Sequence, residues 1–212
     1  MTASYHDVRF TEDPRRNVLW RALWRYYFSR QIAPDDSVLD IGCGYGAFIN
    51  EVVARRRIGV DSWPEFTKYL EPGVEGIVGS AVEVGSLVKG QVDFALASNL
   101  FEHLTQSDLT RLLEGLRGIL SQKGTLNVIQ PNFAYAFREY FDDYTHVSVY
   151  THVSLSDLIS ANGFEVIEVQ PRFLPFSIKG RLPVSEPLIR AYLASPIKPL
   201  GKQMLIRARV RQ

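Results

Sequence analysis

The chain has little cysteine, little excess charge and no long apolar run. Its single cysteine, Cys43, has no partner for a disulfide within the chain. The opening segment MTASYHDVRF lacks the apolar core of a secretion signal, so we expect a cytoplasmic protein. No apolar run approaches the roughly 20 residues that span a bilayer. Contact with a membrane would therefore be peripheral.

The formal net charge of +1 gives the molecule no overall field to attract nucleic acid, and its basic residues are scattered. With 46% hydrophobic residues, 212 residues suffice for one sizeable core. We expect a single domain over residues 1–212. Its expected parts are a helical cover (1–36), a cofactor-binding core (37–131), an acceptor-side insertion (132–153) and a C-terminal part with the end of the sheet and a basic excursion (154–212).

Apolar runs alternate with helical periodicity along most of the chain. Strands are predicted for the run that begins at Val38 and for residues 57–61, 75–80, 92–98, 124–131, 164–173 and 202–210. Helices are predicted for residues 14–32, 48–56, 64–70, 107–120, 154–163 and 187–194. This alternation predicts an α/β fold with a Rossmann-like, seven-stranded, mostly parallel sheet, helices on both faces and an antiparallel last strand. Ligands of such sheets lie at the carboxyl ends of the strands.

Residues 132–153 interrupt the alternation with an aromatic-rich segment that follows Pro131. The next helix has Ser154 followed by Asp157, which resembles a capping box, and Gly163 as its stop signal. Because the insertion leaves the end of a strand, we expect it to lie over the cleft.

The stretch VLDIGCGYGAF, Val38 to Phe48, is an apolar run that ends in an acid and three glycines. Gly42 and Gly44 allow close approach of a ligand, and a helix beginning near Gly46 would offer free N–H groups to it. The spacing also fits the dinucleotide fingerprint, so an NAD-dependent oxidoreductase is an alternative. Asp40, however, would repel a pyrophosphate and favour the cationic arm of S-adenosylmethionine.

The segments VLDIGCGYGAF, IGVD and VDFALASNLFEHL closely resemble the successive motifs of class I S-adenosylmethionine-dependent methyltransferases. The resemblance implies that Asp61 holds the ribose hydroxyls of S-adenosylmethionine. The methionine arm would be held by Asp40, Gly42, Cys43, Gly44, Gly46, Ser98 and Asn99. Near the adenine amine the family usually has an acid, whereas this sequence has Ser80 followed by Ala81.

Two segments bear on the methyl acceptor. QPNF follows the fifth predicted strand, whereas the similar motif of nucleobase methyltransferases follows the fourth, so we expect no nucleic-acid acceptor. Residues 140–166 and 172–183 resemble bacterial methyltransferases associated with polysaccharide biosynthesis. That resemblance implies that a sugar or glycan hydroxyl is methylated.

A sugar hydroxyl has a pKa far above neutrality, so its attack benefits from a positioned general base. The predicted base is His146, oriented by Asp143, with His152 and Asp142 as further candidates. Tyr140 is predicted to contact the acceptor. Glu102 and His103 are interpreted as capping and packing residues of the following helix, Cys43 as a filler of the turn, and no metal ligands are predicted.

Other functions share these motifs. A small-molecule or lipid methyltransferase would have the same cofactor residues, and a non-catalytic S-adenosylmethionine-binding partner would leave Asp143 and His146 without a chemical task. The C-terminal part also holds a basic segment with Arg172, Lys179, Arg181, Arg190 and Lys198. Two interpretations of this segment are open: a binding surface for a glycosyltransferase or for a lipid-linked glycan at the inner face of the membrane, and an ordinary solvent-exposed surface.

Overall fold

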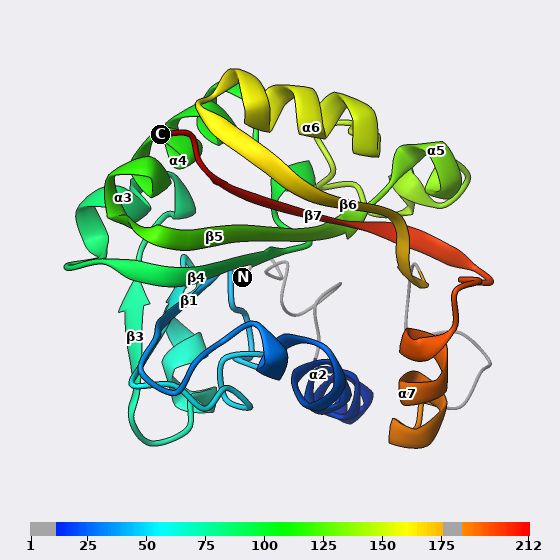
Figure 1. Ribbon diagram of the computed structural model, residues 1–212, viewed down its shortest axis with the longest axis horizontal. Coiled ribbons are helices and arrows are strands. Elements are labelled where there is room, and N and C mark those ends of the chain that lie inside the picture. The colour runs from blue at the N-terminus through cyan, green and yellow to red at the C-terminus, as the bar shows by residue number, and fades with distance from the viewer. Residues whose placement is uncertain (1–11, 176–183) are drawn as a thin grey trace, which may run out of the picture.

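The computed structural model describes residues 12–175 and 184–212, and seven strands in them form one sheet. The order across the sheet is β3-β2-β1-β4-β5-β7-β6 (Figure 1). The strands are β1 Ser37–Ile41, β2 Arg56–Asp61, β3 Val74–Val78, β4 Val92–Ser98, β5 Leu120–Pro131, β6 Phe164–Pro175 and β7 Gly201–Val210.

Neighbouring strands from β3 to β5 pair in parallel, and β7 pairs antiparallel with both β5 and β6. The predicted fold class is therefore confirmed, including the antiparallel last strand. All five residues of β1 are buried, which agrees with a strand covered on both faces. A central strand of this kind places its carboxyl end in the middle of the ligand-binding edge.

Helices cover both faces of the sheet (Figure 1). One face packs against α4 and α6 through an aliphatic cluster that includes Leu112 and Ile159. The other packs against α2 through an aromatic cluster that includes Trp20 and Phe28. The α-helices are α2 Pro14–Tyr26, α3 Val84–Leu87, α4 Gln106–Ile119, α5 Phe133–Ala136, α6 His152–Ala161 and α7 Glu186–Ala194; the 3₁₀ helices are η1 Phe28–Arg30, η2 Pro64–Tyr69, η3 Ala81–Glu83, η4 Phe101–His103 and η5 Tyr140–Asp142.

The predicted helix over residues 48–56 is wrong, because residues 44–51 form a series of turns. Gly46, two residues before this segment, has a φ of +68°, a left-handed conformation in which a right-handed helix cannot begin. The side chain of Asn50 donates to the Tyr69 carbonyl and accepts from the Glu71 N–H, which ties the segment to the end of η2. The N–H groups near Gly44 and Gly46, which were expected at the N-terminus of a helix, therefore belong to a turn.

The helix signals elsewhere agree better with the structure. Asp13 accepts a hydrogen bond from the Arg15 N–H and caps α2 at the predicted start of that helix. The capping box of α6 is formed by Thr151 and Ser154, one turn before the predicted start, and Gly163 follows the helix with a φ of +86°. Among the described residues, no helix is long and apolar enough to pass through a bilayer.

Two glycines bring α3 and α4 into backbone contact. A Cβ atom built on Gly85 would lie 2.7 Å from the Cα atom of Gly115 and 3.0 Å from its carbonyl oxygen. Because this contact is with backbone atoms, no side chain can move aside for an added methyl group, and the two helices would have to move apart. Gly118, on the same helix α4, has nothing within 4 Å of the equivalent position.

We expect Gly85→Ala to lower the free energy of unfolding by about 1 to 3 kcal/mol, because the added methyl overpacks a backbone contact. Gly118→Ala should instead raise it by about 0.5 to 1 kcal/mol, since alanine is the better helix former in open space. Equilibrium denaturation in urea measures both values. Equal stability of the two variants would contradict the close approach of α3 and α4.

Candidate active site

The register of the parallel strands brings three predicted cofactor residues to one edge of the sheet. Ile41 pairs with Val60 of β2 and with Ala97 of β4, so Gly42 is level with Asp61 and Ser98. Gly42 and Gly44 have φ values of +68° and +52°, which L-residues with side chains rarely adopt. A Cβ atom on Gly42 would lie 3.1 Å from the side chain of Leu100. The glycine turn and the end of β4 therefore meet closely.

Asp61 anchors the glycine turn from the end of β2. Its Oδ2 atom accepts a hydrogen bond of 2.8 Å from the Gly44 N–H, and its Oδ1 atom accepts one of 2.9 Å from the Trp63 N–H. An ionised carboxylate offers about four acceptor sites. Asp61 can therefore hold this turn and accept bonds from two ligand hydroxyls as well.

Asp40 lies under the turn, with an exposed fraction of 4%. Burial, followed by the nearby charge of Asp61, raises the pKa of its carboxyl group to about 8. An ionised Asp40 is thus costly in the protein alone, and a ligand that brings positive charge to this place would favour it.

Cys43 fills space in the turn. Its Sγ atom would lie 3.0 Å from a Cβ atom on Gly59 of β2, and burial raises the pKa of its thiol above the ordinary value. A buried thiol held in the protonated form is a poor nucleophile. The geometry agrees with the predicted filling role.

The remaining predicted cofactor residues have contacts within the fold. Ser80 is exposed and caps η3, which begins at Ala81, through its side chain. Asn99 has a φ of +50°, donates its N–H to the Ile129 carbonyl at 2.7 Å, and accepts at Oδ1 from Gln203 of β7 at 3.0 Å. These bonds tie the end of β4 to β5 and β7.

Three aromatic side chains that the sequence analysis did not single out lie beside Asp61. The ring of Tyr45 is 5.1 Å from that of Trp63 and 4.7 Å from that of Tyr69, measured between centroids. Trp63 and Tyr69 follow β2, where the family resemblance gives only the acid. The sequence feature that could have pointed to this aromatic group was Trp63, two positions after Asp61.

The insertion is fastened to η4, the turn that follows β4. The Glu102 carbonyl accepts hydrogen bonds from the N–H groups of Val147, at 2.9 Å, and Ser148, at 3.1 Å. The Ser148 hydroxyl donates to the Leu104 carbonyl at 2.6 Å. This docking brings residues 143–148 onto η4 despite more than 40 residues of intervening chain.

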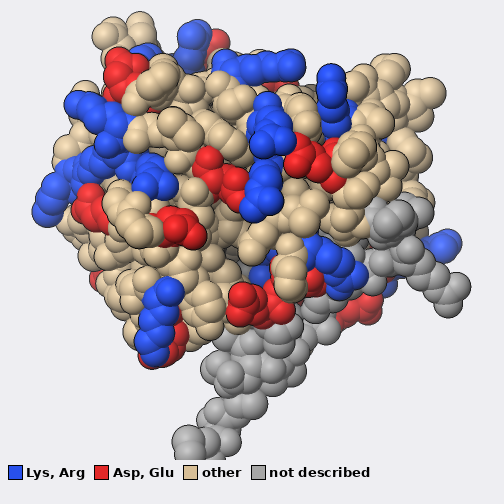
Figure 2. All heavy atoms as spheres, turned by 90° about the horizontal axis from the view of Figure 1, so that it is seen from below, with Lys and Arg blue, Asp and Glu red and all other residues tan. Residues whose placement is uncertain are grey.

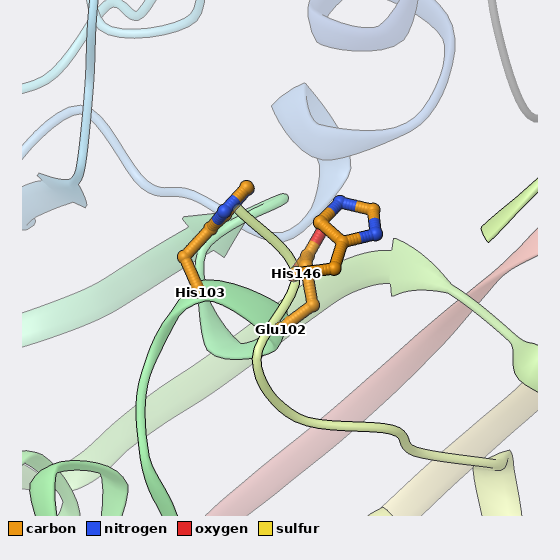
Figure 3. Close-up of side chains that lie close together, drawn as sticks. All are labelled: Glu102, His103 and His146. Carbon is orange, nitrogen blue, oxygen red and sulfur yellow. The ribbon is translucent and has the colours of Figure 1, made fainter. Parts of the chain in front are cut away.

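Glu102, His103 and His146 meet at this docking point, with their potential ligand atoms within 4.8 Å of one another. Figure 3 shows Glu102 and His103 rising from η4 and His146 reaching them from the insertion. Glu102 is fully buried, and burial together with the charge of Asp143 raises the pKa of its carboxyl group to about 8. Burial, then the neighbouring His146, lowers the pKa of His103, which keeps that imidazole neutral.

Backbone carbonyls orient both imidazoles of this cluster. The Nδ1 atom of His146 lies 2.6 Å from the Tyr140 carbonyl, and that of His103 lies 3.2 Å from the Thr145 carbonyl and 2.9 Å from the Thr145 hydroxyl. A carbonyl only accepts, so each Nδ1 carries the proton and each lone pair is at Nε2. The Tyr140 carbonyl thus has the orienting position predicted for Asp143.

Asp143 acts on the cluster through Thr145. Its Oδ1 atom accepts hydrogen bonds from the N–H of Thr145 at 3.0 Å and from its hydroxyl at 2.6 Å. Because that hydroxyl donates to Asp143, it accepts from His103. Asp143 is therefore connected to His103 through Thr145, and its predicted pairing with His146 stays a prediction.

Two further predicted residues have structural contacts. Tyr140 is fully buried, and its hydroxyl donates to the Ser148 carbonyl at 2.6 Å, so its ring has no free face for an acceptor; this prediction does not agree with the structure. His152 begins α6, and its Nδ1 atom accepts from the Asn132 amide at 3.0 Å. It stands outside the cluster. Glu102 and His103, interpreted from the sequence as packing residues, are instead at its centre.

The family and fold of the chain follow from comparison with known proteins. A family model described as a methyltransferase domain matches residues 14–169. The structure resembles a SAM-dependent methyltransferase from Archaeoglobus fulgidus, with 24% identity, coverage of 91% of this chain and 93% of the other, and a TM-score of 0.66.

Two other solved structures have the same fold at lower identity. The CcbJ methyltransferase from Streptomyces caelestis is 13% identical over 99% of this chain and 97% of the other, with a TM-score of 0.68. The N-methyltransferase NodS from Bradyrhizobium japonicum WM9, in complex with S-adenosyl-L-homocysteine, is 14% identical over 99% and 94%, with a TM-score of 0.66. No curated protein sequence matches the chain. The family match covers well over half of the chain, so the protein belongs to the methyltransferase family, as an enzyme whose cofactor is S-adenosylmethionine.

Proposed function

We propose that the protein transfers the methyl group of S-adenosylmethionine to a hydroxyl group of a sugar or glycan. One observation carries the hydroxyl acceptor: two imidazoles and a buried carboxyl group converge on η4, directly after the end of β4. A methyl group on a sulfonium is already activated, so the enzyme must align the reactants and remove the proton of a weakly acidic acceptor. The cluster of Glu102, His103 and His146 supplies groups for that task.

The cofactor would lie across the carboxyl ends of β1, β2 and β4. The glycine turn leaves room for the methionine arm, Asp40 favours its positive charge, and Asp61 accepts from the ribose hydroxyls. The rings of Trp63 and Tyr69, which follow Asp61 in the chain, offer apolar surface for the adenine.

The reaction is a displacement at carbon. The acceptor oxygen attacks the methyl carbon, the bond between that carbon and sulfur breaks, and its electron pair goes to sulfur to leave S-adenosylhomocysteine. The hydroxyl proton leaves toward the cluster, where His146 is the candidate catalytic residue. Loss of positioned acid–base catalysis typically costs about 100- to 10,000-fold in rate.

Exposed aromatic side chains of the insertion support a sugar acceptor. Phe137, Phe141 and Tyr144 have exposed fractions of 56%, 61% and 71%. Aromatic faces provide apolar contact of the kind that the C–H faces of a sugar ring use. These three residues replace Tyr140 as the proposed acceptor contacts.

The charge distribution gives no support to a nucleic-acid acceptor. Figure 2 shows acidic and basic side chains interspersed over the visible face, and the net charge is +1. Three basic residues of the C-terminal excursion are engaged within the protein: Arg172 lies over the Tyr135 ring, Arg190 over the Tyr26 ring, and Lys198 donates to carbonyls at the end of α7. Lys179 and Arg181 lie outside the described residues. A peripheral membrane contact or a glycosyltransferase partner is therefore left out of the proposal.

We expect Asp61→Asn to weaken S-adenosylhomocysteine binding by about 1.5 to 3 kcal/mol, because an amide cannot replace charge-assisted bonds to the ribose. Titration calorimetry measures the change. Asp93→Asn is the matched control, since Asp93 accepts from the Ser37 N–H and the Ser121 hydroxyl at the opposite edge of the sheet. It should lower stability and leave the affinity unchanged. Equal losses of affinity, or binding of NAD in place of S-adenosylmethionine, would contradict the cofactor site.

Cofactor binding should release a proton from Asp40. With its pKa raised to about 8, Asp40 is protonated in the free protein at pH 7. The positive charge of the methionine arm lowers that pKa, so binding at pH 7 should release close to one proton, and binding at pH 9 should release little. Calorimetry in two buffers with different heats of ionisation measures this number. Asp40→Asn should abolish the release, and a release that persists in this variant would assign it to another group.

The acceptor class can be tested with labelled cofactor and a panel of sugars, glycans, amines, lipids and RNA. We expect product with the methyl group on oxygen, located by mass spectrometry and NMR. With that acceptor, His146→Ala should lose about 100- to 10,000-fold in turnover and keep its melting temperature and its affinity for S-adenosylhomocysteine. His152→Gln is the control and should remain active. A methyl group on nitrogen or on RNA would overturn the hydroxyl acceptor.

A further inference from the structure

The carboxyl group of Glu102 is buried without compensation. Its residue has no exposed surface, and neither Oε1 nor Oε2 has a hydrogen-bond partner among the residues that the structure describes. An isolated carboxylate in this position is costly unless a cation or hydrogen-bond donors offset its desolvation. Its oxygens approach the ring nitrogens of His103 and His146 (Figure 3).

The two imidazoles are arranged as metal-binding histidines usually are. In both rings Nδ1 faces a backbone carbonyl, of Thr145 for His103 and of Tyr140 for His146. Metal-ligating histidines typically donate their second ring N–H to a carbonyl or carboxylate, which fixes the tautomer and increases ligand basicity. The Nε2 lone pair is then the one presented to an ion.

The distances allow one ion to be shared. Ligand atoms bound to a single ion at about 2.0 to 2.2 Å lie roughly 3 to 4 Å apart, depending on geometry. The candidate atoms of Glu102, His103 and His146 lie within 4.8 Å of one another, so small side-chain rotations would bring them to these separations. We propose that these three residues bind one divalent transition-metal ion whose open coordination positions receive the acceptor hydroxyl, a role that rests on the proposed function.

The ligand set selects the class of ion. Two imidazoles with one carboxylate suit zinc, iron, manganese, cobalt or nickel better than magnesium or calcium, which prefer oxygen ligands. Three protein ligands leave at least one position open, as in catalytic rather than structural sites. Two adjacent sugar hydroxyls can occupy neighbouring open positions, which accords with the proposed acceptor.

An ion at this place would replace a histidine base. The Nε2 atom of His146 either accepts a proton or binds the ion, and a second imidazole and a carboxylate beside it favour binding the ion. A hydroxyl bound to the ion loses its proton to solvent more readily, because the cation stabilises the oxygen anion. That oxygen then attacks the methyl carbon, and the electron pair of the broken C–S bond stays with sulfur.

Further contacts hold the three proposed ligands in place. Asp143 accepts from the Thr145 hydroxyl, which in turn accepts from His103, so the carboxylate supports one ligand from behind. The Val147 and Ser148 bonds to the Glu102 carbonyl hold the insertion, and with it His146, against η4. The cluster is therefore connected to the fold on both of its sides.

The test is direct metal binding by the full chain after removal of metals with a chelator. We expect Co²⁺ to give visible absorption bands with one equivalent bound, and Zn²⁺ to raise the melting temperature of the metal-free protein. Glu102→Gln keeps the size of the buried side chain and removes its charge. It should weaken Co²⁺ and Zn²⁺ binding by roughly 100-fold or more, while the variant remains folded without metal.

His152→Gln is the matched control, because this imidazole also belongs to the insertion end of the chain but lies outside the cluster. It should bind one equivalent like the parent protein. Absence of Co²⁺ binding and of any Zn²⁺ effect on melting, or metal binding that survives Glu102→Gln unchanged, would overturn the site.

The outcome is independent of the acceptor assay. If Glu102→Gln loses the metal ion and the methyl group is found on nitrogen, the metal site stands and the hydroxyl acceptor is overturned. Oxygen methylation that proceeds undiminished in a chelator, by protein that binds no Co²⁺ or Zn²⁺, would overturn the metal site and keep the proposed function. S-adenosylhomocysteine affinity should not change with the chelator, since none of Glu102, His103 and His146 is among the residues proposed to hold the cofactor.

Discussion

The acceptor side of this methyltransferase depends on one backbone group, the carbonyl of Glu102. It accepts from two successive N–H groups, those of Val147 and Ser148, and so fixes the insertion on the turn after β4. Together with the Ser148 bond to the Leu104 carbonyl and the contacts between Thr145 and His103, it sets the position of His146 relative to Glu102 and His103, although α4, β5, α5 and η5 separate them in the chain. A backbone acceptor suits this task, since its position is set by the sheet and does not vary with the state of any side chain.

The proposed cofactor site is likewise held together by a few specific contacts. Asp61 holds the glycine turn through the Gly44 N–H and holds the chain after β2 through the Trp63 N–H. Leu100, from the turn after β4, closes on Gly42 from the other side. The same short stretch after β4 thus packs against the glycine turn with Leu100 and contacts the insertion with Glu102, so the proposed cofactor and acceptor sites are neighbours.

Buried acids occur on both sides, with different surroundings. The pKa values of Asp40 and Glu102 are both raised to about 8, chiefly by burial. For Asp40, the cationic arm of the cofactor is the proposed compensation. Glu102 has two imidazoles beside it and no hydrogen bond from the described residues. Buried acids with raised pKa values concentrate at functional sites, because selection for stability alone would remove them.

The sequence by itself determined the sheet, its strand positions and the glycine turn with Asp40 and Asp61, because these follow from local patterns: apolar runs of strand length, glycines that need positive φ, and an acid at a strand end. It also predicted the start of α2 and the boundaries of η2, α4 and α7 closely, whereas α2 ends six residues before the predicted end. It failed over residues 48–56, because the left-handed Gly46 precedes this segment and the Asn50 side chain ties it to Tyr69. The tertiary structure alone decided the contents of the acceptor site. Tyr140 became a core residue, Asp143 a support for Thr145, and Glu102 and His103 the partners of His146. The physical reason is that this site is made by docking two segments distant in the chain, and no periodicity or spacing within either segment encodes which side chains face each other across that contact.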